Sequence, residues 1–212
     1  SASASAYIEN YGIEQHAYYG DVADVSLKNT GVFDIAAIAH ATANVKSASA
    51  YASIDYGVYQ YAYASDDEVS AAAAIINGSG TFAVIASAAA SGATNAKAYA
   101  YNYYPIEQYA YYGKDSTATL DNESGVVAIE AVAKAEALAK TAYAYAFMYT
   151  GVYQYADANG TTGANALDQI TNGGTMAIVA QASATGTKKV TASAYISNYG
   201  IYQSALGGDT VK

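Results

Sequence analysis

The phrase that decides the fold is Gly57-Val58-Tyr59-Gln60, because the chain repeats it at regular intervals. It returns as Gly12-Ile13-Glu14-Gln15, Gly151-Val152-Tyr153-Gln154 and Gly200-Ile201-Tyr202-Gln203, while Pro105-Ile106-Glu107-Gln108 replaces only the glycine. The closing glutamines recur at spacings of 45, 48, 46 and 49 residues. Self-similarity at a period of this order predicts a solenoid, a propeller or a repeat array.

Each repeat has a tyrosine-rich half and a tyrosine-free half. All 24 tyrosines fall in five segments, namely 7–19, 51–63, 99–112, 143–155 and 195–202. The stretches between them carry a second phrase, Asn29-Thr30-Gly31, Asn77-Gly78-Ser79-Gly80, Asn122-Glu123-Ser124-Gly125 and Asn172-Gly173-Gly174. The unit is therefore a two-part module of about 47 residues. We expect one repeat domain over residues 1–212, with units at 1–46, 47–94, 95–140, 141–188 and, incomplete, 189–212.

Small or apolar residues occupy every second position in both halves of the module. Ala4, Ala6 and Ile8 show this alternation near the start of the chain. A period of two residues predicts β-strands, and glycine-punctuated turns support an all-β chain. The exception left open is Glu130–Lys140, an alanine-rich segment whose intrinsic propensity favours a helix.

The fold class that follows is a parallel β-solenoid, and two coil sizes are compatible with the repeat. A coil of about 47 residues stacks like halves on like halves. This arrangement is favoured because identical Asn, Gln and aromatic residues then form parallel in-register ladders. A coil of about 23 residues would alternate tyrosine rungs with alanine rungs, and it remains the alternative. In the favoured coil two long bent strands face each other, one coated in tyrosine, and alanine inside implies a flattened two-sheet cross-section.

The composition excludes several classes of protein. The net charge is −9 and all nine basic residues are lysines, which argues against nucleic-acid binding because phosphate affinity depends on clustered Lys and Arg. The chain has no cysteine, so disulfides, thiolate catalysis and Cys-type metal sites are absent. No run approaches the roughly 20 apolar residues of a membrane helix. We expect no cofactor and no bound metal.

A pattern that begins at the repeated glutamine carries a resemblance. Gln15-His16-Ala17-x-x-Gly20-Asp21 is echoed by Gln108-Tyr109-Ala110-x-x-Gly113-Lys114. It resembles the curlin-type repeats of bacterial functional amyloid, which place Gln and Asn in internal ladders, and the alternating alanines resemble the long repeats of giant bacterial surface proteins. The chain departs from curlin in its double unit, its missing second glutamine and its abundant tyrosine. The resemblance implies a secreted, filamentous or adhesive protein that is not an enzyme.

The candidate site residues are mainly structural. The glutamines are expected to point inward and hydrogen-bond from rung to rung, since a buried primary amide must be satisfied; they are Gln15, Gln60, Gln108, Gln154 and Gln203. The glycines are expected to permit a positive φ and so a bend or a bulge; they are Gly12, Gly31, Gly57, Gly80, Gly125, Gly151, Gly174 and Gly200.

The outward tyrosines form a candidate binding face for a glycan, for a surface or for lateral association. Its members are Tyr11, Tyr59, Tyr61, Tyr109, Tyr153, Tyr155 and Tyr202. His16 and His40 have no counterpart in the other modules, so we interpret them as tolerated outward side chains and expect no catalytic site. Acidic loops such as Asp66-Asp67 lack the Gly-rich nonapeptide of calcium β-rolls.

Two functions from different classes remain. The first is a structural extracellular or cell-surface protein, a self-associating fibre or stalk segment whose shape is its function. The second is an adhesin-type module that attaches its tyrosine face to a surface glycan. The start within a repeat, at Ser1-Ala2-Ser3-Ala4, predicts that the chain is a piece of a longer repetitive polypeptide.

Overall fold

The structure is a computed structural model that describes residues 1–19, 22–64, 69–159, 163–207 and 210–211. Within these residues every regular element is a β-strand, so none of them forms a helix that could cross a membrane. The strands are β1 (Ala2–Tyr18), β2 (Val22–Asn29), β3 (Val32–Ala43), β4 (Ser47–Tyr63), β5 (Ser70–Asn77), β6 (Thr81–Gly92), β7 (Asn95–Tyr111), β8 (Asp115–Asn122), β9 (Val126–Ala137), β10 (Thr141–Asp157), β11 (Asn165–Asn172), β12 (Thr175–Thr185), β13 (Lys189–Leu206) and β14 (Thr210–Val211).

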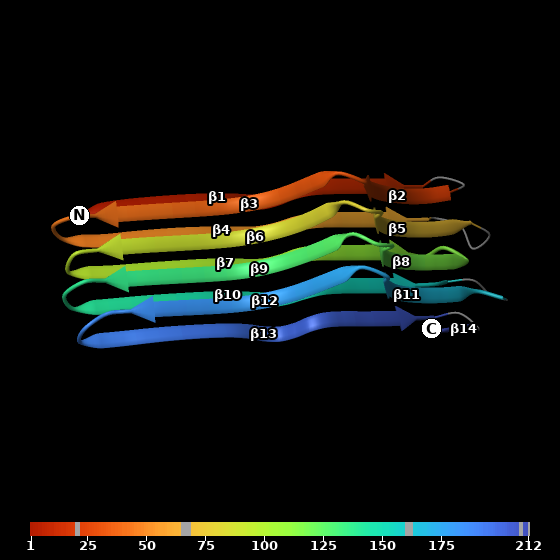
Figure 1. The fold of residues 1–212 in the computed structure, drawn as a ribbon. Coiled ribbons are helices and arrows are strands. Elements are labelled where there is room, and N and C mark those ends of the chain that lie inside the picture. The colour runs from red at the N-terminus through yellow and green to blue at the C-terminus, as the bar shows by residue number, and fades with distance from the viewer. Residues whose placement is uncertain (20–21, 65–68, 160–162, 208–209, 212) are drawn as a thin grey trace.

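One coil of the solenoid consists of three successive strands, a long one followed by two shorter ones. The long strands stack in the order β1-β4-β7-β10-β13 to form sheet A, and all their pairings are parallel. Sheet B has the order β14-β11-β8-β5-β2 and sheet C the order β12-β9-β6-β3. Figure 1 shows the coils stacked one below another, with the first at the top.

The register confirms the coil of about 47 residues and shows that the alternative of about 23 residues is wrong. Gln60 of β4 pairs with Gln108 of β7, and Asn77 of β5 pairs with Asn122 of β8. Tyrosine-rich strands therefore neighbour only tyrosine-rich strands. Identical residues meet across the stack because both halves of the module fit within one turn.

The cross-section has two layers, as expected, but the second layer is divided into two sheets. Sheet A faces sheets B and C across a shared interior, and Figure 1 shows the sheet C strands in front of the sheet A strands. The division falls at the second repeated phrase, where residues 30–31 bend the chain between β2 and β3. There the Asn29 side chain bonds both the N–H and the carbonyl of Gly31, which holds the bend in place.

The interior is built mostly from alanine. Ala50, Ala52, Ala88 and many equivalent alanines are buried in one cluster that runs along the whole stack. Small side chains allow the layers to lie close together, while Phe82, Ile54 and Ile129 fill the wider region near the bend. The core is long and thin, and it depends on stacking for burial because a single coil could not enclose it.

The segment with the strongest helical propensity is a strand. Residues of β9 pair in register with β6 on one side and β12 on the other. Ala131, Ala133 and Ala135 are buried, while Glu130, Lys134 and Glu136 lie on the outer face. Tertiary pairing on both edges overrides the helical preference of this alanine-rich sequence.

The expectation that the glycines adopt positive φ is wrong for the eight repeated positions. Among the described residues, positive φ is found in glycine only at Gly163 and Gly207. What the repeated glycines provide is close approach of backbones. A Cβ atom on Gly80 would clash with the backbone of Gly31, and Gly125 and Gly174 have the same relation to the coil before each.

The glycines of sheet A act in the same way inside continuous strands. A Cβ atom on Gly57 would clash with the carbonyl oxygen of Pro105, and one on Gly151 would meet that of Gly200. Gly12 lies against Ile35 and Gly57, whereas Gly200 has open space. Glycine therefore permits the coils to stack at these positions.

Replacing Gly80 with alanine is expected to lower the free energy of unfolding by about 1–3 kcal/mol, the usual range for overpacking. Gly31→Ala is the matched control, because a Cβ atom there meets no atom within 4 Å. Urea unfolding of the two variants measures the difference. Equal stability would show that the close approach of the coils does not constrain this position.

Candidate functional site

A column of five glutamines runs through the interior between sheet A and sheet B. Each Nε2 donates to the Oε1 of the preceding glutamine, at 2.8 Å for Gln60 to Gln15, 2.8 Å for Gln108 to Gln60, 2.9 Å for Gln154 to Gln108 and 2.8 Å for Gln203 to Gln154. The three inner members are fully buried. The column joins all five long strands by side-chain bonds in addition to their backbone ladder.

The glutamine amides also bond to the facing sheet. Gln15 donates to the Ser26 carbonyl at 3.1 Å, Gln60 to that of Ala74 at 3.0 Å and Gln108 to that of Thr119 at 2.9 Å. These bonds connect the two layers of the solenoid. Because the three inner glutamines use both amide hydrogens inside the protein, this part of the column is suited to holding the layers and coils together.

A second column, which the sequence analysis marked only as a bend, is formed by asparagines. Asn29 Nδ2 donates to Asn77 Oδ1 at 2.8 Å, Asn77 to Asn122 at 2.8 Å and Asn122 to Asn172 at 2.6 Å. The same Nδ2 groups also donate to backbone carbonyls, such as Thr81 for Asn29. The signal was present in the sequence, because the asparagines recur at the period of the glutamines.

The two columns point in opposite directions along the solenoid. In the glutamine column each side chain donates toward the first coil. In the asparagine column each side chain donates toward the last coil. The two ends of the molecule therefore present different and complementary amide groups.

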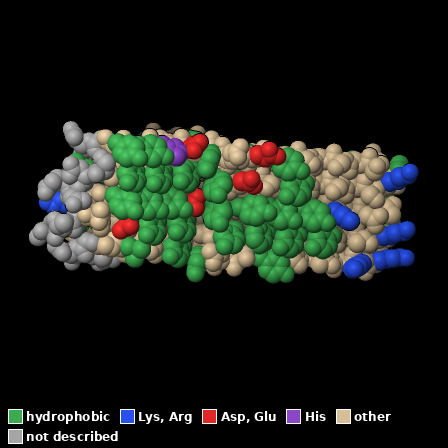
Figure 2. Space-filling view, turned by 180° about the vertical axis from the view of Figure 1, so that it is seen from behind, with side chains coloured by type: hydrophobic (Ala, Val, Ile, Leu, Met, Phe, Trp, Pro, Cys, Tyr) green, Lys and Arg blue, Asp and Glu red, His purple; other side chains and the backbone are tan. Residues whose placement is uncertain are grey.

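The outer face of sheet A carries a continuous array of tyrosine rings. Figure 2 shows hydrophobic side chains covering much of this face, with few charged groups among them. The seven tyrosines of the candidate binding face are all linked by ring contacts, with centroid distances of 5.0 Å for Tyr11–Tyr59, 5.7 Å for Tyr59–Tyr109, 5.4 Å for Tyr109–Tyr153, 4.8 Å for Tyr153–Tyr202, 6.2 Å for Tyr61–Tyr109 and 6.3 Å for Tyr109–Tyr155. Neighbouring aromatic pairs of this kind contribute about 0.2–1 kcal/mol each to a sheet.

The rings shield one another from water, which alters the titration of the groups among them. Burial raises the pKa of Tyr101 to about 12, and burial together with the nearby Glu107 carboxylate raises the pKa of Tyr109. The carboxyl of Glu107 lies buried under the array, where burial raises its pKa and the Tyr109 hydroxyl donates to its Oε1 at 2.8 Å. The Tyr101 and Tyr109 hydroxyls are therefore neutral at physiological pH.

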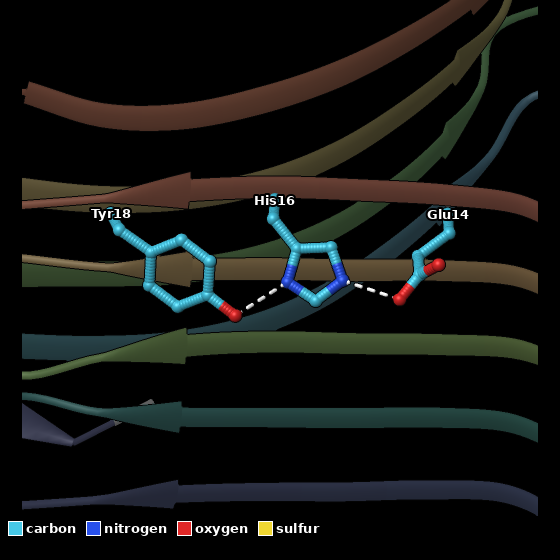
Figure 3. Close-up of polar contacts among 3 residues, drawn as sticks. All are labelled: Glu14, His16 and Tyr18. Carbon is cyan, nitrogen blue, oxygen red and sulfur yellow. Dashed lines mark hydrogen bonds and ion pairs between the residues drawn. The ribbon is translucent and has the colours of Figure 1, made fainter.

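His16, which we interpreted as a tolerated outward side chain, is bonded to two neighbours on the same strand. Its Nδ1 lies 2.6 Å from the Tyr18 hydroxyl and its Nε2 lies 2.7 Å from Glu14 Oε1. Figure 3 shows the three side chains in a row along β1, which alternation places on one face. His16 also contacts Tyr61 at a centroid distance of 5.8 Å and so occupies a tyrosine position of the array.

His40 lies on the opposite layer. It lines a shallow groove on sheet C with Ser91, Lys134 and Glu136, the last two of which form an ion pair of 2.7 Å. Within the described ranges no group of three or more His, Asp or Glu side chains is arranged to hold a metal ion. The loop acids Asp66 and Asp67 lie outside the described residues.

Two buried polar side chains that the sequence did not indicate each have an oxygen without a hydrogen-bond partner. Asn102 occupies a position held by Ile54 and Met148 in the adjacent coils; its Nδ2 donates to the carbonyls of Val84 and Glu130, and its Oδ1 has no partner. Asp168 lies on β11 in the fourth coil, where its Oδ2 accepts from the Ser204 N–H at 2.7 Å and its Oδ1 has no partner. Each breaks the repeat in one coil only.

Replacing Gln108 with leucine should leave Gln60 Oε1 and the Gln154 amide without their column partner. We expect a loss of about 1–3 kcal/mol for each buried group left unpaired, measured by urea unfolding. Gln203→Leu is the matched control, since it removes one bond at the exposed end of the column. Tyr155→Ser tests the outer face and should cost less than Gln108→Leu; the reverse order would mean that the tyrosine array contributes more to stability than the amide column.

Asp168 should destabilise the protein at neutral pH relative to its Asp168→Asn variant, and this difference should disappear in acid. Burial raises the pKa of Asp168 to about 6 from 3.8, so the folded state favours the neutral carboxyl. The benefit of protonation is complete below about pH 4 and is lost as the pH rises through 6. Asp168→Asn should therefore gain about 1–3 kcal/mol at pH 7 and nothing at pH 3.5, as measured by denaturant unfolding at both pH values. An equal effect at both pH values would contradict the assignment.

Comparisons of this chain with protein-family models, with curated proteins and with solved structures found no match. The functional conclusion therefore depends on the stacked strands, the two amide columns and the tyrosine face.

Proposed function

We propose that this chain is a structural protein, a rigid β-solenoid rod that associates end to end into a fibre or a surface stalk. The observation that carries the proposal is the in-register stacking of like coils, because the same pairing can continue from one chain to the next. β1 and β13 each have one edge without a neighbouring strand among the described residues. Unpaired parallel edges of this length template further pairing unless a protein covers them.

The interior supports the same function. Hydrogen bonds continue through all the coils by way of two amide columns, so a load along the axis is shared by backbone and side chains. Stability in a solenoid is a sum of neighbouring interfaces, and a stack that adds coils gains one interface for each. This is the behaviour required of a fibre or stalk.

The resemblance to curlin-type and bacterial surface repeats supports an extracellular or cell-surface location for the rod. The internal Gln and Asn ladders are the features that this chain shares with such repeats. A catalytic role for the Glu14-His16-Tyr18 row is not part of the proposal, because these side chains lie on an open face of the sheet.

An adhesin-type binding module is the second candidate, and one feature favours it. Asp55, Tyr56, Tyr103 and Tyr104 line a hollow on the tyrosine face. Aromatic rings beside a carboxylate are suited to a sugar, because the rings pack on its C–H groups and the carboxylate accepts from its hydroxyls.

Negative-stain microscopy at neutral pH and rising protein concentration tests the proposal. We expect filaments one coil wide, with fibre diffraction showing the strand spacing of about 4.8 Å along the filament axis. A tyrosine-face variant, Tyr103→Ser, should still form filaments, because it leaves both ends unchanged. Dispersed particles that bind a glycan array and lose that binding in Tyr103→Ser would establish the second candidate instead.

A further inference from the structure

The last long strand repeats the first one more closely than it repeats any strand between them. Residues 192–203 of β13 match residues 4–15 of β1 at every position except Ser197 and Tyr202, which replace Glu9 and Glu14. Both replaced glutamates are exposed. The inward residues are identical, and none of β4, β7 or β10 has isoleucine at both of the positions occupied by Ile8 and Ile13.

The two strands also share an irregularity. Two residues lie between Ile8 and Tyr11 in β1, but one lies between their partners Ile54 and Tyr56 in β4. Two residues likewise lie between Ile196 and Tyr199 in β13, and one between Met148 and Thr150 in β10. The register is unbroken between β4 and β7 and between β7 and β10. The first and last strands thus have the same extra residue at the same place.

β13 lacks the layer that covers β1. Among the described residues sheet C ends at β12, and sheet B adds only β14 beyond β11. The inward Ile196 and Ile201 are consequently 40% and 44% exposed, whereas Ile54 and Val58 at the equivalent places in β4 are fully buried. An apolar strand face identical to that of β1 is left open.

We propose that β13 of one copy takes the place of β1 in a second copy of this chain. There it lies on β4 of the second copy and is covered by β2 and β3 of that copy, while the displaced β1 is released. The inference rests on the proposed self-association and names its partner and geometry. In this chain the segment that covers the identical side chains of β1 is Val22–Ala43, which identifies the segment that fits β13.

The amide columns fix the direction of the exchange. In the new place Gln203 Oε1 would accept from Gln60 of the second copy, as Gln15 Oε1 does now at 2.8 Å. Asn172 would donate to Asn29 Oδ1, because donation in that column runs toward the last coil. Two chains joined by their last coils would instead bring Gln203 Oε1 of one copy toward Gln203 Oε1 of the other. Both oxygens are acceptors, so no hydrogen bond could form between them. The exchange therefore joins copies head to tail.

Exchange also closes both layers, which simple stacking does not. If β13 of the first copy stacked on an intact β1 of the second copy, sheet A would be continuous. In sheet C, however, β12 of the first copy and β3 of the second copy would be separated by the space of one strand. With β1 displaced, β12 meets β3 directly, and β11 meets β2 once β14 leaves the Asn165–Ala166 edge with which it pairs in this chain. All three sheets then continue from one copy to the next.

Disulfide trapping distinguishes these arrangements, because the chain has no cysteine of its own. Ser3 pairs with Ser49, and Thr191 is the counterpart of Ser3 in β13. Exchange places Thr191 beside Ser49 of the second copy, within the Cα separation of about 4.4–6.8 Å that a disulfide spans. Within one chain β7 and β10 separate these two positions.

Ser49→Cys and Thr191→Cys chains should be refolded together and oxidised, with non-reducing electrophoresis and mass spectrometry as the readout. We expect a disulfide-linked dimer of one chain of each kind, which reductant abolishes. Mixing Ser3→Cys with Thr191→Cys should give only monomers. A dimer from the Ser3→Cys mixture, without one from the Ser49→Cys mixture, would show that copies stack with β1 in place and would overturn the exchange.

A second pair of variants tests the buried face of β13 in the Thr191→Cys chain. Ile201→Asp should abolish the crosslink, because exchange would bury the carboxylate, while Ser197→Glu should retain it, since β1 has a glutamate at that place. Crosslinking that survives Ile201→Asp would overturn the proposal. Filaments that form without the crosslink between the Ser49→Cys and Thr191→Cys chains would refute the exchange and leave the fibre proposal intact, whereas monomers under all conditions would refute both.

Discussion

A primary amide removed from water must find partners for its two N–H groups and its oxygen, and in this protein the partners are the same amide in the neighbouring coils and backbone carbonyls. Gln108 lies between Gln60 and Gln154 and bonds to both, which is possible only when each coil places the same residue at the same position. Burying such a group unpaired would cost about 1–3 kcal/mol. A shift of one residue in any coil would turn the amide out of the core, so the columns hold the register of the whole stack.

The closeness of the coils imposes a second constraint. Where the chain bends between β5 and β6, Gly80 lies against the backbone of Gly31, and no side chain fits between them. The alanines of the interior act in the same way across the layers, since larger side chains at Ala50 or Ala88 would push sheet A away from sheet C. Repetition of small residues thus sets both the separation of the coils and the thickness of the rod.

The proposed function follows from what these constraints leave at the surface and at the ends. The inner amides are used within the protein, so among the described residues the tyrosine face, the groove on sheet C and the two ends of the stack are surfaces that a partner can contact. The ends differ, because the glutamine and asparagine columns donate in opposite directions. A rod with different ends joins head to tail, and this heterologous arrangement gives an open chain of copies.

Much of the architecture could be predicted from the sequence, because the same residue pattern occurs in each of the repeated modules. The period of the glutamines predicted the module, alternation predicted strands, and stacking of like on like predicted the larger coil, which the pairing of Gln60 with Gln108 confirms. Local pattern could not show that the glycines serve close approach, because their φ angles are ordinary and the clash comes from the next coil. The sequence pattern predicted only a bend at Asn29 and its equivalents. Their hydrogen bonds to one another form between coils, so a local pattern could not show them.

The properties of residues that depart from the repeat were decided by tertiary structure alone. Asp168 appears in one coil and Glu107 shares its repeat position only with Glu14, and the titration of Asp168 and Glu107 depends on burial by residues distant in sequence. The strand at Glu130–Lys140 was left open because its propensity is helical, and pairing with β6 and β12 determines it. Sequence therefore determined what recurs, namely the period, the strands and the inward glutamines. Tertiary structure decided the features that depend on a neighbouring coil, such as the close approach of the glycines and the asparagine column. These features come from contacts between coils, and the residues in contact are far apart in the sequence.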